Sequence, residues 1–112
     1  MMLALTLRDK DGGERQLSFQ EDEITIGRMD GSDIVLARNN ISKTHASVLV
    51  SEGKILVSDQ RSTNGTYVNG RRITAPQELT PDDKIYIGDF VIQCHLATGT
   101  EETTSPETQA AD

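Results

Sequence analysis

The sequence contains no tryptophan, one cysteine and only four aromatic residues among 112. So few aromatic side chains argue against a surface that stacks nucleic-acid bases. Because Cys94 has no second cysteine with which to form an internal disulfide, a cytoplasmic location is expected. No apolar run approaches the roughly 18 residues that span a bilayer. The first residues also lack the basic-then-apolar pattern of a secretory signal. We therefore expect neither secretion nor membrane insertion.

Basic residues are also in the minority, with 18 acidic and 11 basic side chains and a formal net charge of −7. Nucleic acids and anionic membranes both favour proteins of positive charge, so neither is expected as a partner. The charge is unevenly distributed, however. Residues 28–72 hold seven basic and four acidic side chains, whereas residues 96–112 hold four acidic and no basic ones. If the chain binds an anion, residues 28–72 are the part that favours it.

Helical periodicity is nearly absent, and period-two alternation takes its place. Leu3, Leu5 and Leu7 alternate with smaller or polar residues before a glycine-rich turn, which predicts a strand. The Asn69-Gly70 pair predicts a tight hairpin within residues 67–72, because both residue types accept positive φ. Further strands are predicted at 17–19, 24–26, 33–36, 46–50, 54–58, 84–87 and 90–96. Strands that recur about every 8–12 residues are typical of an all-β sandwich or barrel, which we expect for residues 1–97.

Residues 98–112 differ in composition from the rest of the chain. They contain no aromatic, basic or branched aliphatic residue, so they cannot offset the entropy lost on ordering. We expect a disordered acidic tail there. Thr103 and Thr104 follow two glutamates and are candidate phosphorylation sites, although a soluble spacer without further function explains the same composition.

Three polar segments between the predicted strands contain the candidate functional residues. In the first, a strand ends in Gly27-Arg28, where glycine permits a close approach and Arg28 projects from the end of the sheet. A plain surface arginine is the alternative there. In the second, residues 39–45, Ser42 offers a hydroxyl donor and Lys43 a positive charge, which both suit an anion. The third, residues 59–70, has the composition of a turn-rich loop, but Asn64 could also grip a peptide backbone through its amide.

His45 admits three roles: a base for Ser42, a metal ligand or a structural residue. Beyond carboxylates, only His45, His95 and Cys94 are available as metal ligands, and they lack ligand spacing, so no metal site is expected. A nucleophile would need an orienting carboxylate and a strained turn such as Gly-x-Ser-x-Gly, and neither is evident. We favour a buried His45 that fixes the loop.

In order and spacing, these segments resemble the forkhead-associated (FHA) domain. The resemblance rests on Ile26-Gly27-Arg28, on Ser42-x-x-His45, and on Ser62-Thr63-Asn64-Gly65-Thr66-Tyr67-Val68-Asn69-Gly70. It covers roughly Leu3 to Leu96. It implies a twisted β-sandwich of about eleven strands, of the SMAD/FHA type, whose loops at one end bind phosphothreonine peptides.

The resemblance also assigns roles to individual residues. Phosphate contacts fall to four residues: Arg28, Ser42, Lys43 and Thr63. Asn64 would hydrogen-bond the main chain of the peptide. Family members recognise the third residue after the phosphothreonine through loop residues near Asn40 and Arg61. These loop positions vary within the family. Structural positions are matched by three residues: Gly27, His45, which would brace the loops from behind, and Gly65.

The function implied is a binding module without catalysis or cofactor, an adaptor in Ser/Thr kinase signalling. Its partner would be a phosphothreonine-containing protein or peptide, and a phosphorylated tail could compete for the same site. The first alternative is a scaffold subunit that binds an unmodified partner through its sheet surface. A hydrolase built on Ser42 and His45 is a more distant one. The oligomeric state stays open.

Overall fold

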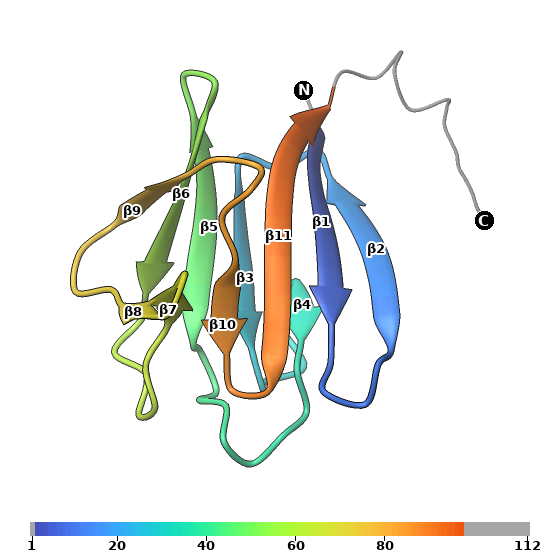
Figure 1. Cartoon of the computed structure of the whole chain (residues 1–112), viewed down its shortest axis with the longest axis vertical. Helices are drawn as coiled ribbons and strands as arrows, with labels where there is room; N and C mark the ends of the chain where they lie inside the picture. The colour runs from blue at the N-terminus through green and yellow to red at the C-terminus, as the bar shows by residue number, and fades with distance from the viewer. Residues whose placement is uncertain (1, 98–112) are drawn as a thin grey trace.

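The computed structural model describes residues 2–97. The expected tail, with Thr103 and Thr104, lies outside the described residues, so the domain boundary stays a prediction. Eleven strands make up the fold (Figure 1): β1 (Met2–Arg8), β2 (Glu14–Phe19), β3 (Glu23–Gly27), β4 (Ile34–Val35), β5 (Ala46–Ser51), β6 (Lys54–Asp59), β7 (Tyr67–Val68), β8 (Arg71–Arg72), β9 (Gln77–Leu79), β10 (Ile85–Ile87) and β11 (Phe90–Ala97). None of these residues forms a helix that could cross a bilayer.

The strands form two sheets. One has six strands in the order β2-β1-β11-β10-β7-β8, and the other has five in the order β4-β3-β5-β6-β9. Neighbouring strands pair antiparallel, except that β3 pairs parallel with the short β4. The expected all-β sandwich of about eleven strands is therefore confirmed.

The core lies between the inward faces of the two sheets. Leu3, Leu5 and Leu7 of β1 are at most 3% exposed, whereas the residues between them are only partly buried. Cys94 on β11 lies opposite Leu5 and is also buried. Burial raises the pKa of its thiol to about 12, so this cysteine behaves as a small apolar core residue.

The turn and strand predictions differ from the structure at one place. Asn69 and Gly70 have φ values of 53° and 89°, as the predicted hairpin between β7 and β8 requires. Strand β9, however, has no counterpart among the predicted strands. It is only three residues long and buries Leu79 alone, which pairs with Ile55 of β6. A single buried residue leaves no alternation to detect.

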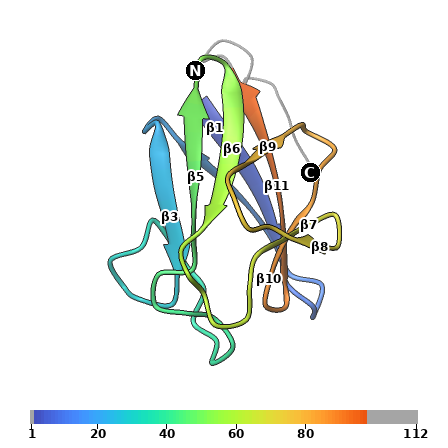
Figure 2. The ribbon, with the colours of Figure 1, turned by 90° about the vertical axis from the view of Figure 1, so that its left-hand side faces the viewer.

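Figure 2 shows where the connections lie. The β3–β4, β4–β5, β6–β7 and β10–β11 connections gather at one end of the sandwich, and the β1–β2 turn lies at the same end. The first strand begins and the last strand ends at the opposite end. The three polar segments of the sequence therefore meet at one end of the molecule.

Candidate functional site

Arg28 is the first residue after β3, and its side chain is anchored by the β4–β5 loop. Its backbone N–H donates to the carbonyl of Ser42 at 3.0 Å. Its Nε donates to the carbonyl of Ile41, also at 3.0 Å. Within residues 2–97 the two terminal guanidinium nitrogens form no hydrogen bond or ion pair, and the residue is exposed. The stem is thus oriented while the donor fork remains available to a ligand.

Gly27 permits this arrangement because there is no space for a side chain. A Cβ at this position would lie 2.1 Å from the carbonyl oxygen of Lys43, far inside van der Waals contact. The Gly27 carbonyl accepts a hydrogen bond from Leu36, at 2.8 Å. Glycine therefore brings the end of β3, and with it Arg28, directly against the β4–β5 loop.

Two hydrogen bonds join the β4–β5 loop to the β6–β7 loop. The backbone N–H of Thr63 donates to the Ser42 hydroxyl at 2.9 Å. The Nδ2 of Asn64 donates to the carbonyl of Asn40, also at 2.9 Å. Because the Ser42 oxygen acts as acceptor here, its own hydrogen is left to donate elsewhere. Four of the predicted site residues are thereby brought together.

His45 lies behind these loops and is fully buried, at 0% exposure. Its Nδ1 accepts from the backbone N–H of Ser42 at 3.1 Å, and its Nε2 lies 2.8 Å from the carbonyl of Gly65. Since Nδ1 faces a donor and Nε2 an acceptor, the ring hydrogen belongs on Nε2. The backbone of His45 also donates to Ile26 of β3. The ring thus links Ser42 of the β4–β5 loop to Gly65 of the β6–β7 loop, and it braces the two loops against each other.

Asp59, at the end of β6, organises the β6–β7 loop, and the sequence reasoning missed it. Its carboxylate accepts hydrogen bonds from the hydroxyl and backbone N–H of Ser62 and from the hydroxyl of Thr66. The Ser62 hydroxyl oxygen in turn accepts from the N–H of Gly65. Aspartate side chains commonly accept hydrogen bonds from the backbone of a turn that follows them, so an aspartate at the start of this turn-rich loop was a signal present in the sequence.

Two effects oppose each other at the Asp59 carboxyl. Burial raises its pKa, but the hydrogen bonds from Ser62 and Thr66 together outweigh burial, and the pKa lies below its ordinary value. The carboxylate is therefore held in its charged, accepting form. That form fixes the curvature of the loop that presents Thr63 and Asn64.

The remaining predicted residues lie in the same loops. Lys43, Arg61 and Thr63 have exposed side chains, and those of Lys43 and Arg61 form no ion pair in the described part of the chain. Arg61 adopts a φ of 57°, which few side chains favour. Asn40 is half-buried beside the β10–β11 turn, where a methyl group at Gly88 would lie 3.1 Å from its Nδ2.

Met29 is an exposed apolar side chain beside this site, and the sequence reasoning did not select it. It is 49% exposed and follows Arg28 directly. Its backbone N–H donates to the carbonyl of Lys43 at 3.2 Å, so it shares the β4–β5 contact that orients Arg28. An exposed methionine next to a cationic site offers an adaptable apolar contact.

A β-sandwich that gathers cations, hydroxyls and amides on the loops at one end belongs to the class of loop-based recognition modules. The particular family follows from comparison. Residues 24–88 match the FHA domain model, and the chain belongs to the FHA domain family. This match confirms the resemblance found in the sequence. FHA domains bind phosphothreonine in kinase signalling.

Several known proteins are similar to this chain. The oxoglutarate dehydrogenase inhibitor of Corynebacterium efficiens is 39% identical over 88 residues, covering 79% of this chain and 61% of that protein. The transcriptional regulatory protein EmbR of Mycobacterium tuberculosis is 34% identical over 79 residues, covering 70% of this chain and 20% of EmbR. The chain thus spans about a fifth of EmbR and less than two thirds of the inhibitor.

Two solved structures show the same fold. That of Mycobacterium tuberculosis EmbR in complex with a low-affinity phosphopeptide has a TM-score of 0.74 at 32% identity, and covers 88% of this chain and 26% of that one. That of the FHA domain of CT664 from Chlamydia trachomatis has a TM-score of 0.77 at 22% identity, covering 88% of this chain and all of the other.

Proposed function

We propose that this chain binds phosphothreonine-containing peptides at the clasp formed by the β3–β4, β4–β5 and β6–β7 loops. The observation that carries the proposal is the anchored Arg28. Its Nε is held by the Ile41 carbonyl, while its terminal nitrogens remain unpaired in the described residues. Such a fork matches the oxygens of a phosphate.

The donors around Arg28 fit the chemistry of this ligand. A phosphate monoester carries about −1.5 to −2 charges near neutral pH and three acceptor oxygens. Arg28, the Ser42 hydroxyl, the Thr63 hydroxyl and the Lys43 ammonium would share them, and each hydrogen bond to a charged group contributes about 1.5–3 kcal/mol. The Asn64 side chain uses one N–H to bond the Asn40 carbonyl. Its other N–H and its amide oxygen would hydrogen-bond the main chain of the peptide.

The wider role follows from this binding. The chain would act as an adaptor that recognises a partner after a Ser/Thr kinase has phosphorylated it, without catalysis and without a cofactor, in the cytoplasm. Its acidic total charge disfavours general polyanion binding, so affinity would depend on the specific donors. Asn40 and Arg61 are the proposed selectivity residues because they flank the clasp.

The Thr-rich tail gives a means of self-regulation. If Thr103 or Thr104 were phosphorylated, the tether to the domain would give the phosphothreonine a local concentration of roughly millimolar near the site. The phosphorylated tail would then compete with external peptides. The test is to treat the full chain with a Ser/Thr kinase, confirm the mass shift and titrate an external phosphothreonine peptide. Weaker binding supports self-regulation. Unchanged binding, or the same loss in a Thr103→Ala/Thr104→Ala variant, contradicts it.

An oriented phosphothreonine peptide library tests the function and its selectivity together. The wild-type chain should enrich a subset of the library, and the Arg28→Ala variant should enrich none. If no phosphothreonine peptide binds while an unmodified partner does, the chain is instead a scaffold that uses its sheet surface.

A further inference from the structure

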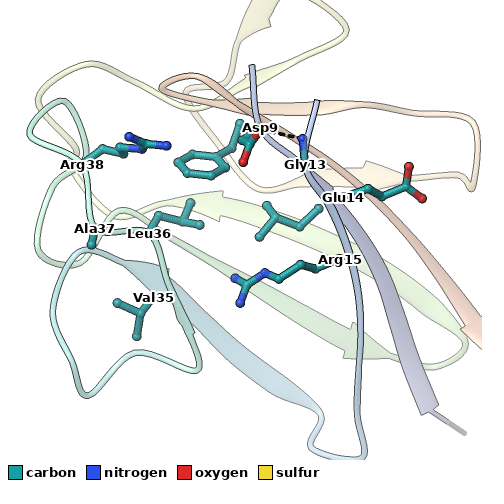
Figure 3. A pocket seen from close by; sticks show the side chains of 10 residues that line it. Asp9, Gly13, Glu14, Arg15, Val35, Leu36, Ala37 and Arg38 are labelled. Carbon is teal, nitrogen blue, oxygen red and sulfur yellow. Dashed lines mark hydrogen bonds between the residues drawn. The ribbon is translucent and has the colours of Figure 1, made fainter. Parts of the chain in front are cut away.

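A second feature lies at the same end of the sandwich. A pocket of about 420 Å³, open to solvent, lies between the β1–β2 turn, the end of β4 and the start of β11 (Figure 3). Leu7, Leu36 and Phe90 form its base and are at most 7% exposed, so Val35, which is 36% exposed, is the main apolar side chain that a ligand can reach. Pockets of about 300–1,000 Å³ are the usual size for ligand sites, so this one can hold one or two peptide side chains.

Two arginines line the pocket. Figure 3 shows Arg15 and Arg38 on two sides of Leu36. Neither arginine forms an ion pair within residues 2–97, and both are exposed. The guanidinium of Arg38 also lies 5.8 Å from the centroid of the Phe90 ring, which holds it over the apolar lining.

Of the two carboxylates of the pocket, one is paired with a cation and the other accepts local backbone hydrogen bonds. Asp9 accepts hydrogen bonds from the backbone N–H groups of Asp11 and Gly13, at 2.9 and 2.8 Å. Glu14 is paired with Arg8 at 3.2 Å. With Arg8 included, three arginines face two carboxylates, a net charge of +1, and neither Arg15 nor Arg38 is paired within residues 2–97.

The pocket lies near the proposed phosphothreonine site, at the same end of the sandwich. Arg38 precedes Asn40 by two residues in the β4–β5 loop. The side chain of Asn40 lies beside Gly88, where a Cβ would come within 3.1 Å of its Nδ2, and Phe90 follows Gly88 by two residues. An ion pair of 3.7 Å between Lys10 and Asp89 joins the β1–β2 turn to the β10–β11 turn. Two lining residues, Arg38 and Phe90, are therefore each two residues along the chain from the Asn40–Gly88 neighbourhood, which places the pocket beside one of the proposed selectivity residues.

We propose that this pocket is a distal subsite for the same phosphopeptide, and that it takes an apolar side chain next to a carboxylate-bearing one. The apolar side chain would lie against Val35, which is 36% exposed, and the carboxylate would pair with Arg15 and Arg38. This inference rests on the proposed function, because the phosphate contacts supply the anchor. Once the peptide is anchored, a weak distal contact forms intramolecularly and adds to its affinity.

The test uses a phosphothreonine library randomised over about ten residues on each side. Ten extended residues span about 33–36 Å, which exceeds the 27 Å shortest extent of the molecule. The selected long peptide and a truncated version without the distal residues are then titrated against the wild type and two variants. Arg15→Ala/Arg38→Ala alters the pocket. Lys54→Ala/Arg71→Ala removes two positive charges outside it and is the matched control.

The wild type should enrich an acidic residue beside an apolar one at a distal position, and should bind the long peptide about tenfold more tightly than the short one. The pocket variant should lose that advantage and still bind the short peptide normally, and the control should keep it. No distal preference, or equal behaviour of the two variants, overturns the subsite alone. Failure of the short peptide to bind the wild type overturns the proposed function as well.

Discussion

The hydroxyl oxygen of Ser42 accepts a hydrogen bond from the backbone N–H of Thr63 at 2.9 Å. The two residues lie 21 positions apart, so this bond fixes the separation of two loops that the sequence leaves independent. The backbone carbonyl of the same Ser42 accepts a hydrogen bond from the backbone N–H of Arg28. One serine thus joins three strand connections at the proposed phosphate position.

The Ser42→Ala variant should therefore lose binding more than stability. It removes one donor to the phosphate, which predicts about a ten- to hundredfold weaker affinity for a phosphothreonine peptide. Because Thr63 is exposed, water can replace its lost partner, and the unfolding free energy should fall by less than about 1 kcal/mol. Calorimetric titration and chemical unfolding measure the two effects, with exposed Ser18→Ala as control. A loss confined to stability would remove Ser42 from the site.

The His45→Ala variant should behave in the opposite way. It leaves the N–H of Ser42 and the carbonyl of Gly65 without partners behind the loops, which predicts a loss of about 2–5 kcal/mol in unfolding free energy. The melting temperature measures this, and exposed His95→Ala should leave it nearly unchanged. Loss of binding with no loss of stability would contradict the bracing role.

Two glycines of the site region make a matched pair. A Cβ at Gly27 would meet the Lys43 carbonyl at 2.1 Å, whereas one at Gly31 would meet nothing within 4 Å. We expect Gly27→Ala to cost about 1–3 kcal/mol or more and to weaken phosphopeptide binding, because Arg28 must move. Gly31→Ala should stay within about 0.5 kcal/mol of the wild type. Similar unfolding curves for the two variants would show that the β3 end is not constrained as described.

The Asp59 carboxylate predicts a dependence on pH. Its pKa is lower in the folded chain than its ordinary value of 3.8, so its hydrogen bonds add stability above about pH 4, and this stability is lost as the pH falls through the folded value. Asp59→Asn replaces one accepting oxygen by a donor, which predicts a loss of about 1–3 kcal/mol at pH 7.

At a pH well below 3.8 the difference between Asp59→Asn and the wild type should shrink, since the wild-type carboxyl becomes protonated as the pH falls through its lowered pKa. Urea unfolding at both pH values provides the comparison. Asp22→Asn is the control, because the Asp22 carboxylate forms no hydrogen bond in the described residues. A difference that stays constant with pH would show that the Asp59 charge does not hold the loop.

Much of the fold could be predicted because its signals are local. Alternation along β1 and the Asn69-Gly70 turn depend only on neighbouring residues, and both predictions are confirmed. Strand β9 was missed because its formation depends on pairing with β6, which no local pattern encodes.

The candidate site residues were predicted from motifs, but the contacts among them could not be predicted. The hydrogen bond from Thr63 to Ser42 and the contact of His45 with Gly65 join residues about 20 positions apart in sequence. These contacts therefore follow from sheet topology and not from any local pattern. The distal pocket is harder still to predict from the sequence, since it combines residues 7–15, 35–38 and 90. Only the folded chain places these three segments together.

The central claim is that Arg28 anchors a phosphothreonine at the loop clasp. The direct measurement is calorimetric titration of one library-selected peptide, with and without its phosphate, against the wild type and against Arg28→Ala. We predict binding only for the phosphorylated peptide and the wild type, with Arg28→Ala still folded and its melting temperature lower by no more than about 10 °C, as loss of the Arg28–Ile41 hydrogen bond implies. If Arg28→Ala binds the phosphopeptide as tightly as the wild type, or if the unphosphorylated peptide binds equally well, the account is wrong.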